Sequence, residues 1–97
     1  MEKIKSIMPD NPPMWRNKRY KGTVRHEVFF GIKNRRKSIK DGLVVFLTPE
    51  LHNMSKFGVH FNKEFDKELK QIGQATWISY YGKSEEEFRK KYGRSYI

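Results

Sequence analysis

The chain is short, strongly basic and free of cysteine. Its 97 residues include 21 Lys and Arg against 11 Asp and Glu, giving a formal net charge of +10, and 14% of the residues are aromatic. We expect a chain of this length to fold as one domain over residues 1–97, and the charge favours a polyanionic partner. The absence of cysteine excludes disulfides, thiolate catalysis and cysteine-based zinc sites.

The sequence predicts a cytoplasmic protein with no membrane contact. No stretch approaches the roughly 18 consecutive apolar residues of a transmembrane helix. The N-terminus has no apolar core of a signal peptide. The basic segment also lacks the amphipathic helical stripe of a membrane-surface binder.

The first half of the chain predicts a β-hairpin with a long, basic connection. Residues 1–13 are expected to form a poorly ordered arm, because their Asp-Asn-Pro-Pro run blocks helix and sheet. Thr23–Phe30 is rich in β-branched and aromatic residues and predicts a strand. Lys33–Lys40 predicts a charged loop or short helix, and the apolar run Leu43–Thr48 predicts a buried second strand.

The clearest predicted helix follows the hairpin. Leu51–His60 is short and indicates a helical turn followed by a loop. The helix then begins at Phe61 or Asn62 and runs to about Tyr81, since its apolar positions advance by three or four residues. Gly82 is a suitable residue to end it.

A second helix is predicted at the C-terminus. Ser84 and Glu87 have the spacing of a capping box, and the helix is expected to end near Tyr92, with Gly93 as its stop. The fold class is therefore α+β, a hairpin followed by two C-terminal helices. Packing between these helices is the expected role of the late aromatic residues, which are Trp77, Tyr80, Tyr81, Phe88, Tyr92 and Tyr96.

The three histidines are distributed around these elements. His26 lies on the first predicted strand, His52 just after the second, and His60 before the long helix. This order is typical of a ββα-metal nuclease core, in which imidazoles bind a divalent metal that holds the scissile phosphate. The alternative is three ordinary histidines, because a separation of eight residues between His52 and His60 is not a standard metal-binding spacing.

Most of the positive charge lies in one segment. Residues 16–40 contain ten basic residues and one acidic residue, Glu27, whereas residues 57–97 carry only +2. We expect this segment to contact phosphates, although a solvated turn is the alternative. The residues assigned to nucleic-acid binding are Arg16, Arg19, Lys33, Arg35, Arg36 and Lys37. Trp15 and Tyr20 lie among them, placed either to stack on bases or to pack over the hairpin.

Four segments, taken in order, resemble the small phage and prophage HNH endonucleases. They read RHEVFFG from Arg25, NRRKSIKDGLVVFLTPELHN from Asn34, GVHFNKEFDKELK from Gly58 and YGKSEEEFRKKYGRSYI from Tyr81. In that family a His-His or His-Glu pair opens the hairpin, and a Pro-x-x-His or Cys-x-x-His and then a Val-His follow the second strand. The resemblance covers most of the chain and implies a single HNH-like domain.

The resemblance implies metal ligands and a base. His26, His52 and His60 match the ligand positions for a divalent ion such as Mg²⁺, Mn²⁺ or Zn²⁺. Glu27 stands where the family often has its general-base histidine, so Glu27 is expected to act as a base or ligand, with His26 as the base if it is not a ligand. Adjacent residues on a strand point to opposite faces, however, unless a bulge re-aims one.

The resemblance also assigns a role to an asparagine. Asn34 matches the asparagine of the basic loop and is assigned a catalytic role, orienting the base or bracing the phosphate, with Asn53 as the alternative. The family's middle asparagine would fall near Asp41, where this chain has none. Many relatives carry cysteines near the N-terminal turn, where this chain has Met14 and Trp15 and must rely on packing instead.

The resulting hypothesis is a metal-dependent endonuclease that hydrolyses phosphodiester bonds of DNA, with RNA as an alternative substrate. The rival hypothesis is a non-catalytic phage-encoded protein on the same scaffold, which binds nucleic acid or inhibits a nucleic-acid-handling host defence enzyme. The protein would act in the cytoplasm of a host cell as a monomer or homodimer. Its further partner would be a host defence protein or a phage recombination or packaging protein.

Overall fold

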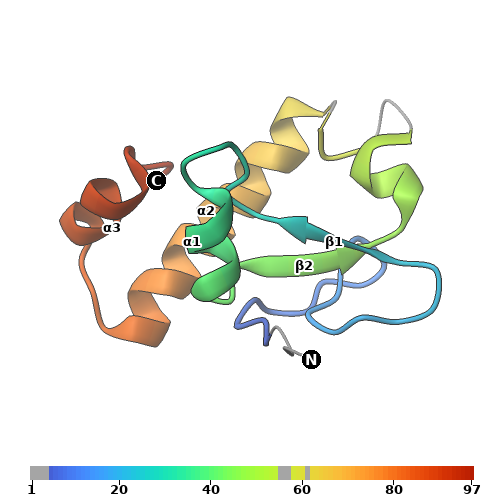
Figure 1. The fold of residues 1–97 in the computed structure, drawn as a ribbon, viewed down its shortest axis with the longest axis horizontal. Coiled ribbons are helices and arrows are strands. Elements are labelled where there is room, and N and C mark those ends of the chain that lie inside the picture. Colours follow the sequence, from blue (N-terminus) through green and yellow to red (C-terminus); the bar gives the residue numbers. More distant parts are fainter. Residues whose placement is uncertain (1–4, 55–57, 61) are drawn as a thin grey trace.

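The computed structural model describes residues 5–54, 58–60 and 62–97. It has two strands, β1 (Val24–Glu27) and β2 (Val44–Leu47), with the helix α1 (Arg35–Lys40) between them in the chain. A short π-helical segment, η1 (Glu50–Met54), then leads to two α-helices, α2 (Lys63–Tyr81) and α3 (Glu85–Tyr92). Figure 1 shows α2 running diagonally across the hairpin, with α3 beside α1 at one end. The predicted α+β order of a hairpin followed by two helices is confirmed.

The two strands pair antiparallel but are shorter than predicted. His26 faces Val45 across the ladder, and Glu27 faces Val44. Beyond β1 the pairing continues only through the Val28 amide, which donates to the Leu43 carbonyl (3.0 Å). After Val28 the side chain of Ser38 bridges the two chain segments in place of backbone hydrogen bonds. Its hydroxyl donates to the Leu43 carbonyl (2.6 Å) and accepts from the Phe29 amide (3.2 Å).

The basic connection contains α1, which confirms the short-helix alternative for this segment. Two contacts attach it to the end of α3. Asn34, just before α1, donates from its side-chain amide to the Tyr92 carbonyl (3.0 Å), and the Lys37 ammonium donates to the Lys91 carbonyl (2.7 Å). Carbonyl groups at the end of a helix lack partners within that helix. These two hydrogen bonds therefore give the last carbonyls of α3 a donor, and they also hold α1 against α3.

The N-terminal segment differs from the expected arm. Residues 6–8 pack against the hairpin and residues 9–13 stay exposed, whereas residues 1–4 lie outside the described part of the chain. The Ile7 amide donates to the Gly42 carbonyl (2.9 Å), and Arg16 exchanges two backbone hydrogen bonds with Phe46 of β2. Met8 and Trp15 are each 1% exposed. Burial of these two side chains offsets the poor secondary-structure propensity of the Asp-Asn-Pro-Pro run.

The two C-terminal helices begin and end where their capping residues predict. The Asn62 side chain accepts hydrogen bonds from the first turn of α2, and Gly82 ends that helix with φ +63°. Ser84 and Glu87 form the predicted capping box of α3, and Gly93 ends it with φ +94°. Phe61, the alternative start of the long helix, is not among the described residues, nor are residues 55–57 of the predicted turn and loop.

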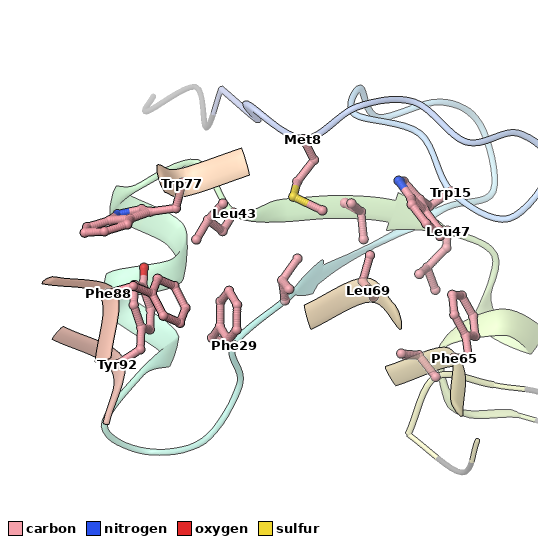
Figure 2. Packing of buried hydrophobic residues seen from close by; sticks show 13 residues of the cluster. Met8, Trp15, Phe29, Leu43, Leu47, Phe65, Leu69, Trp77, Phe88 and Tyr92 are labelled. Atoms are coloured by element: carbon pink, nitrogen blue, oxygen red, sulfur yellow. The ribbon is translucent and has the colours of Figure 1, made fainter. Parts of the chain in front are cut away.

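The core lies between the hairpin, the N-terminal segment and the two helices. Figure 2 shows two groups of buried side chains, one around Trp77, Phe88, Tyr92 and Phe29 and one around Trp15, Leu47, Phe65 and Leu69. The first group confirms that late aromatic residues build the helix–helix core, although Tyr80 and Tyr81 stay exposed. A Cβ at Gly73 would lie 2.9 Å from Val28 Cγ1, so glycine allows α2 this close approach to the chain after β1.

Candidate metal centre

The three histidines converge on one point of the fold. His26 comes from β1, His52 from η1, and His60 from the segment just before α2. One nitrogen of each ring lies within 4.8 Å of those of the other two, and His52 Nε2 is 3.0 Å from His60 Nε2. Such a set of imidazole nitrogens is suited to a borderline divalent metal, so the three histidines form a candidate metal centre.

A backbone turn explains how His52 and His60 meet despite their unusual spacing. The His60 amide donates to the His52 carbonyl (3.1 Å), and the Val59 amide donates to the Leu51 carbonyl (2.6 Å). Gly58 makes this return possible, since a Cβ there would lie 3.0 Å from the backbone of His52. The two imidazoles are therefore brought together by hydrogen bonds between two backbone segments. Standard metal-binding spacings describe ligands that are close in the chain and do not cover this arrangement.

His26 has the environment of a neutral ligand. It is 2% exposed, and its Nε2 has no hydrogen-bond partner within the described ranges. Burial, and next the neighbouring imidazoles of His60 and His52, lowers the pKa of His26 from 6.5 to about 3. A buried nitrogen without a partner is costly, and a metal ion would supply the missing interaction. The residues present therefore fit a bound metal.

Two further groups lie beside the histidines. The Phe30 ring is 4.7 Å from the His60 ring and 5.5 Å from the His26 ring, between centroids. The Lys70 ammonium lies 4.3 Å from the Phe30 ring centroid and pairs with Asp66 (2.8 Å). Lys70 also contributes to the lowered pKa of His26. Sequence reasoning missed Lys70, whose only visible feature is its i,i+4 spacing from Asp66.

Glu27 lies next to His26 in the chain but is bound by two guanidinium groups. Its carboxylate contacts Arg25 Nε at 2.9 Å and Arg35 Nε at 3.3 Å, and its side chain is 12% exposed. The regular pairing of β1 matches the expectation that neighbouring side chains point to opposite faces. Burial, and next the imidazole of His60, lowers the pKa of His52, and the charge of Glu27 partly opposes this shift.

The two candidate asparagines lie in different places. Asn34 is held at the end of α3, where its side-chain amide donates to the Tyr92 carbonyl. Asn53 is exposed on η1, next to His52 in the chain. Asp41, near the position of the family's middle asparagine, belongs to a buried network with Trp77 and Tyr92.

The predicted phosphate-binding residues are largely exposed along the first half of the chain. Arg16, Arg19, Lys33, Arg35 and Arg36 are exposed, and Lys37 is half-buried against α3. Trp15 is buried and stacks on Phe65 at 6.1 Å between ring centroids, so the packing alternative holds for it. Tyr20 stays 40% exposed with the Arg16 guanidinium 5.7 Å from its ring centroid.

Fold and site together define a small α+β protein with a candidate three-histidine metal centre. Comparisons with protein-family models, with curated proteins and with solved structures find no match. No helix in the described residues is long and apolar enough to cross a membrane.

The metal-free protein is expected to lose stability as the pH falls from about 6.5 towards 3. The unfolded chain takes up a proton on His26 in this range while the folded chain does not, because its pKa is lowered from 6.5 to about 3. The unfolded state therefore binds more protons, and the free energy of unfolding increases with pH. Urea unfolding with a chelator at several pH values would show this. The slope should be smaller in His26→Gln, and equal slopes in the two proteins would contradict the prediction.

Proposed function

We propose that this protein is a metal-dependent nuclease that hydrolyses phosphodiester bonds of DNA, with His26, His52 and His60 as its metal ligands. The observation that carries the proposal is the convergence of three imidazoles, one of which has a buried nitrogen without a partner. Two further features support it, the order of two strands and then a helix in the elements around the histidines, and the basic first half of the chain.

The ligand set favours particular ions. Imidazole suits zinc and its neighbours among the transition metals, whereas Mg²⁺ prefers oxygen ligands and keeps several waters. Zn²⁺ or Ni²⁺ is thus a better candidate than Mg²⁺ or Mn²⁺. When bound, such an ion supplies Lewis-acid stabilisation of the phosphate and the leaving oxygen. The protein contributes neutral imidazoles, since burial keeps His26 unprotonated at pH 7.

Glu27 is the proposed base, and its carboxylate is held by Arg25 and Arg35 in the free protein. Arg35 is 65% exposed and holds one carboxylate oxygen of Glu27. If the guanidinium moves to a phosphate of the substrate, this oxygen of Glu27 loses its cationic partner and is free to accept a proton from water. Arg25, the other partner, keeps the side chain in place.

The second candidate function is a non-catalytic protein that binds nucleic acid or a nucleic-acid-handling enzyme. One observation favours it. Both residues assigned to catalysis besides the histidines already have structural partners, Glu27 with two arginines and Asn34 with Tyr92. The histidine centre would then stabilise the fold around a metal ion.

Plasmid nicking separates the two functions. Purified protein is incubated with supercoiled plasmid and Zn²⁺, Ni²⁺, Mn²⁺ or Mg²⁺, with and without chelator. The nuclease proposal predicts nicking that the chelator stops and that restored metal recovers. His52→Ala should reduce the nicking rate by at least about a hundredfold, a loss comparable with removal of other key groups, while duplex affinity stays nearly unchanged. Tight binding without nicking in every metal would support the non-catalytic function instead.

A further inference from the structure

The loop between β1 and α1 presents an apolar side chain to solvent. Ile32 is 103% exposed, more than any other large hydrophobic residue in the described part of the chain. The residues on either side are Gly31 and Lys33, both exposed. A single exposed apolar residue is common on protein surfaces, so its surroundings must decide whether Ile32 has a function.

The loop is a hydrogen-bonded turn, and the residues on both sides of it are held by the rest of the fold. The Gly31 carbonyl accepts from the amides of Asn34 (3.2 Å) and Arg35 (3.0 Å), and Gly31 has φ +113°, which favours glycine. Phe29 is buried in the core before the turn, and Asn34 is bound to Tyr92 after it. Ile32 therefore stands at the tip of a braced turn, and ordering it on a ligand costs little entropy.

Cations surround the tip. Lys33, Arg35 and Arg36 are exposed, and Lys33 and Arg36 form no ion pair with any residue that the structure describes. No acidic residue occurs between Val28 and Lys40. The surface thus combines one projecting apolar side chain with a rim of phosphate-binding groups.

This combination fits a DNA duplex better than a membrane. Proteins that bend DNA insert single apolar side chains between base steps and hold the neighbouring phosphates with Arg and Lys. Membrane-surface binding requires a whole apolar helical face, whereas α1 has only six residues, Arg35–Lys40, with one aliphatic side chain, Ile39.

We propose that Ile32 is a wedge that inserts between adjacent base pairs of double-stranded DNA while Lys33, Arg35 and Arg36 bind the flanking phosphates. The inference rests on the nucleic-acid partner of the proposed function but requires neither a metal nor catalysis. Insertion would unstack one base step and bend the duplex, most readily at a flexible TA step.

Duplex bending tests the proposal with the whole protein. A duplex of about 20 base pairs, a length over which bending costs are known, carries a fluorophore pair at its ends and 2-aminopurine at a central TA step. Measurements are made with chelator, so that cleavage cannot contribute. Wild-type protein should raise both the energy transfer and the 2-aminopurine fluorescence. Ile32→Ser should lose both increases and bind about tenfold more weakly, which corresponds to about 1.4 kcal/mol, with an unchanged salt dependence.

Two variants serve as controls. Tyr80→Ser also removes an exposed apolar group, 61% exposed, from the C-terminal end of α2, which Figure 1 shows well apart from the loop leading into α1. It should keep both fluorescence increases. Arg36→Gln should weaken binding and reduce the salt slope by about one, yet keep both increases at saturation.

The outcomes separate the wedge from the proposed function. Binding by wild-type protein without unstacking, or unstacking that Ile32→Ser retains, would overturn the wedge and leave the nucleic-acid function standing. Absence of duplex binding would overturn both. An effect of Ile32→Ser only on binding to anionic phospholipid vesicles would assign the loop to a membrane surface and overturn the proposal.

Discussion

Asp41→Ala is expected to lower the free energy of unfolding by about 3–5 kcal/mol, because it leaves two buried donors, on Trp77 and Tyr92, without their acceptor. Asp41 is 7% exposed and follows α1 directly. Its carboxylate accepts from Trp77 Nε1 (2.9 Å), Tyr92 Oη (2.8 Å) and Lys91 Nζ (2.7 Å). One side chain thus joins the end of α1 to both C-terminal helices.

The electrostatics of this network agree with its geometry. Burial, and next the hydrogen bond to Asp41, raises the pKa of the Tyr92 hydroxyl well above its ordinary value of 10. Tyr92 therefore keeps its proton and donates a hydrogen bond to the carboxylate of Asp41. The Tyr81 hydroxyl donates to the backbone carbonyl of Asp41 (2.8 Å), and this contact survives the substitution.

Urea unfolding followed by tryptophan fluorescence would measure the loss, with an unchanged m-value as the sign that stability alone has changed. Asp10→Ala is the matched control, since it removes the same charge from a protein of net charge +10. Asp10 accepts one hydrogen bond, from the Asn17 amide at the surface, so its loss should cost about 1 kcal/mol. Equal losses in the two variants would show that net charge, and not the buried network, governs the effect.

The sequence predicted best what local chemistry determines. Asn62, Gly82, the Ser84–Glu87 capping box and Gly93 mark helix ends through contacts within a few residues, and the structure has all of them. The two strands were also predicted in the correct places. The ends of the strands were predicted wrongly, because beyond Val28 the side chain of Ser38, a residue of α1, takes the place of backbone hydrogen bonds between the strands.

Long-range contacts were beyond sequence reasoning. Nothing local in residues 5–13 indicates that Met8 is buried or that Ile7 pairs with Gly42. Asp41 has the appearance of an ordinary turn residue, and its partners lie 36 to 51 positions away in the chain. The ion pair between Arg35 and Glu27, which occupies the carboxylate of the candidate base, was likewise not visible in the sequence.

The histidine group lies between these two cases. The order of the elements predicted that His26, His52 and His60 belong together, and the structure brings them together. The close return of residues 58–60 onto η1 was not predicted, because it depends on the backbone approach that Gly58 permits. A spacing of eight residues is suited to metal binding here only because that return exists.

His26→Ala is expected to abolish the metal-dependent stabilisation of the protein. A metal that binds only the folded state stabilises it by about 2.7 kcal/mol when present at a hundred times its dissociation constant. The wild-type protein should therefore unfold at a higher temperature with Zn²⁺ or Ni²⁺ than with chelator. Loss of one of three imidazoles should weaken the affinity by at least about a hundredfold, the upper end of the effect of removing an outer-shell partner.

Val45→Ala separates loss of the ligand from loss of packing. Val45 faces His26 across the ladder and is fully buried, so both substitutions shorten a buried side chain at the same point of the hairpin. Val45→Ala should destabilise the metal-free protein by about 1–3 kcal/mol through the cavity it leaves, yet it should keep the full metal-induced shift. His26→Ala should lose that shift whatever its stability without metal.

Thermal unfolding and titration calorimetry together decide the result. Wild-type protein and Val45→Ala should bind one metal ion per chain, with release of few protons at pH 7, because His26 is already neutral there. Metal-induced stabilisation that is equal in wild type and His26→Ala would place the metal elsewhere on the chain. Absence of stabilisation in the wild type would leave the buried His26 nitrogen as an unpaired group of the core and remove the basis for a metal-dependent nuclease.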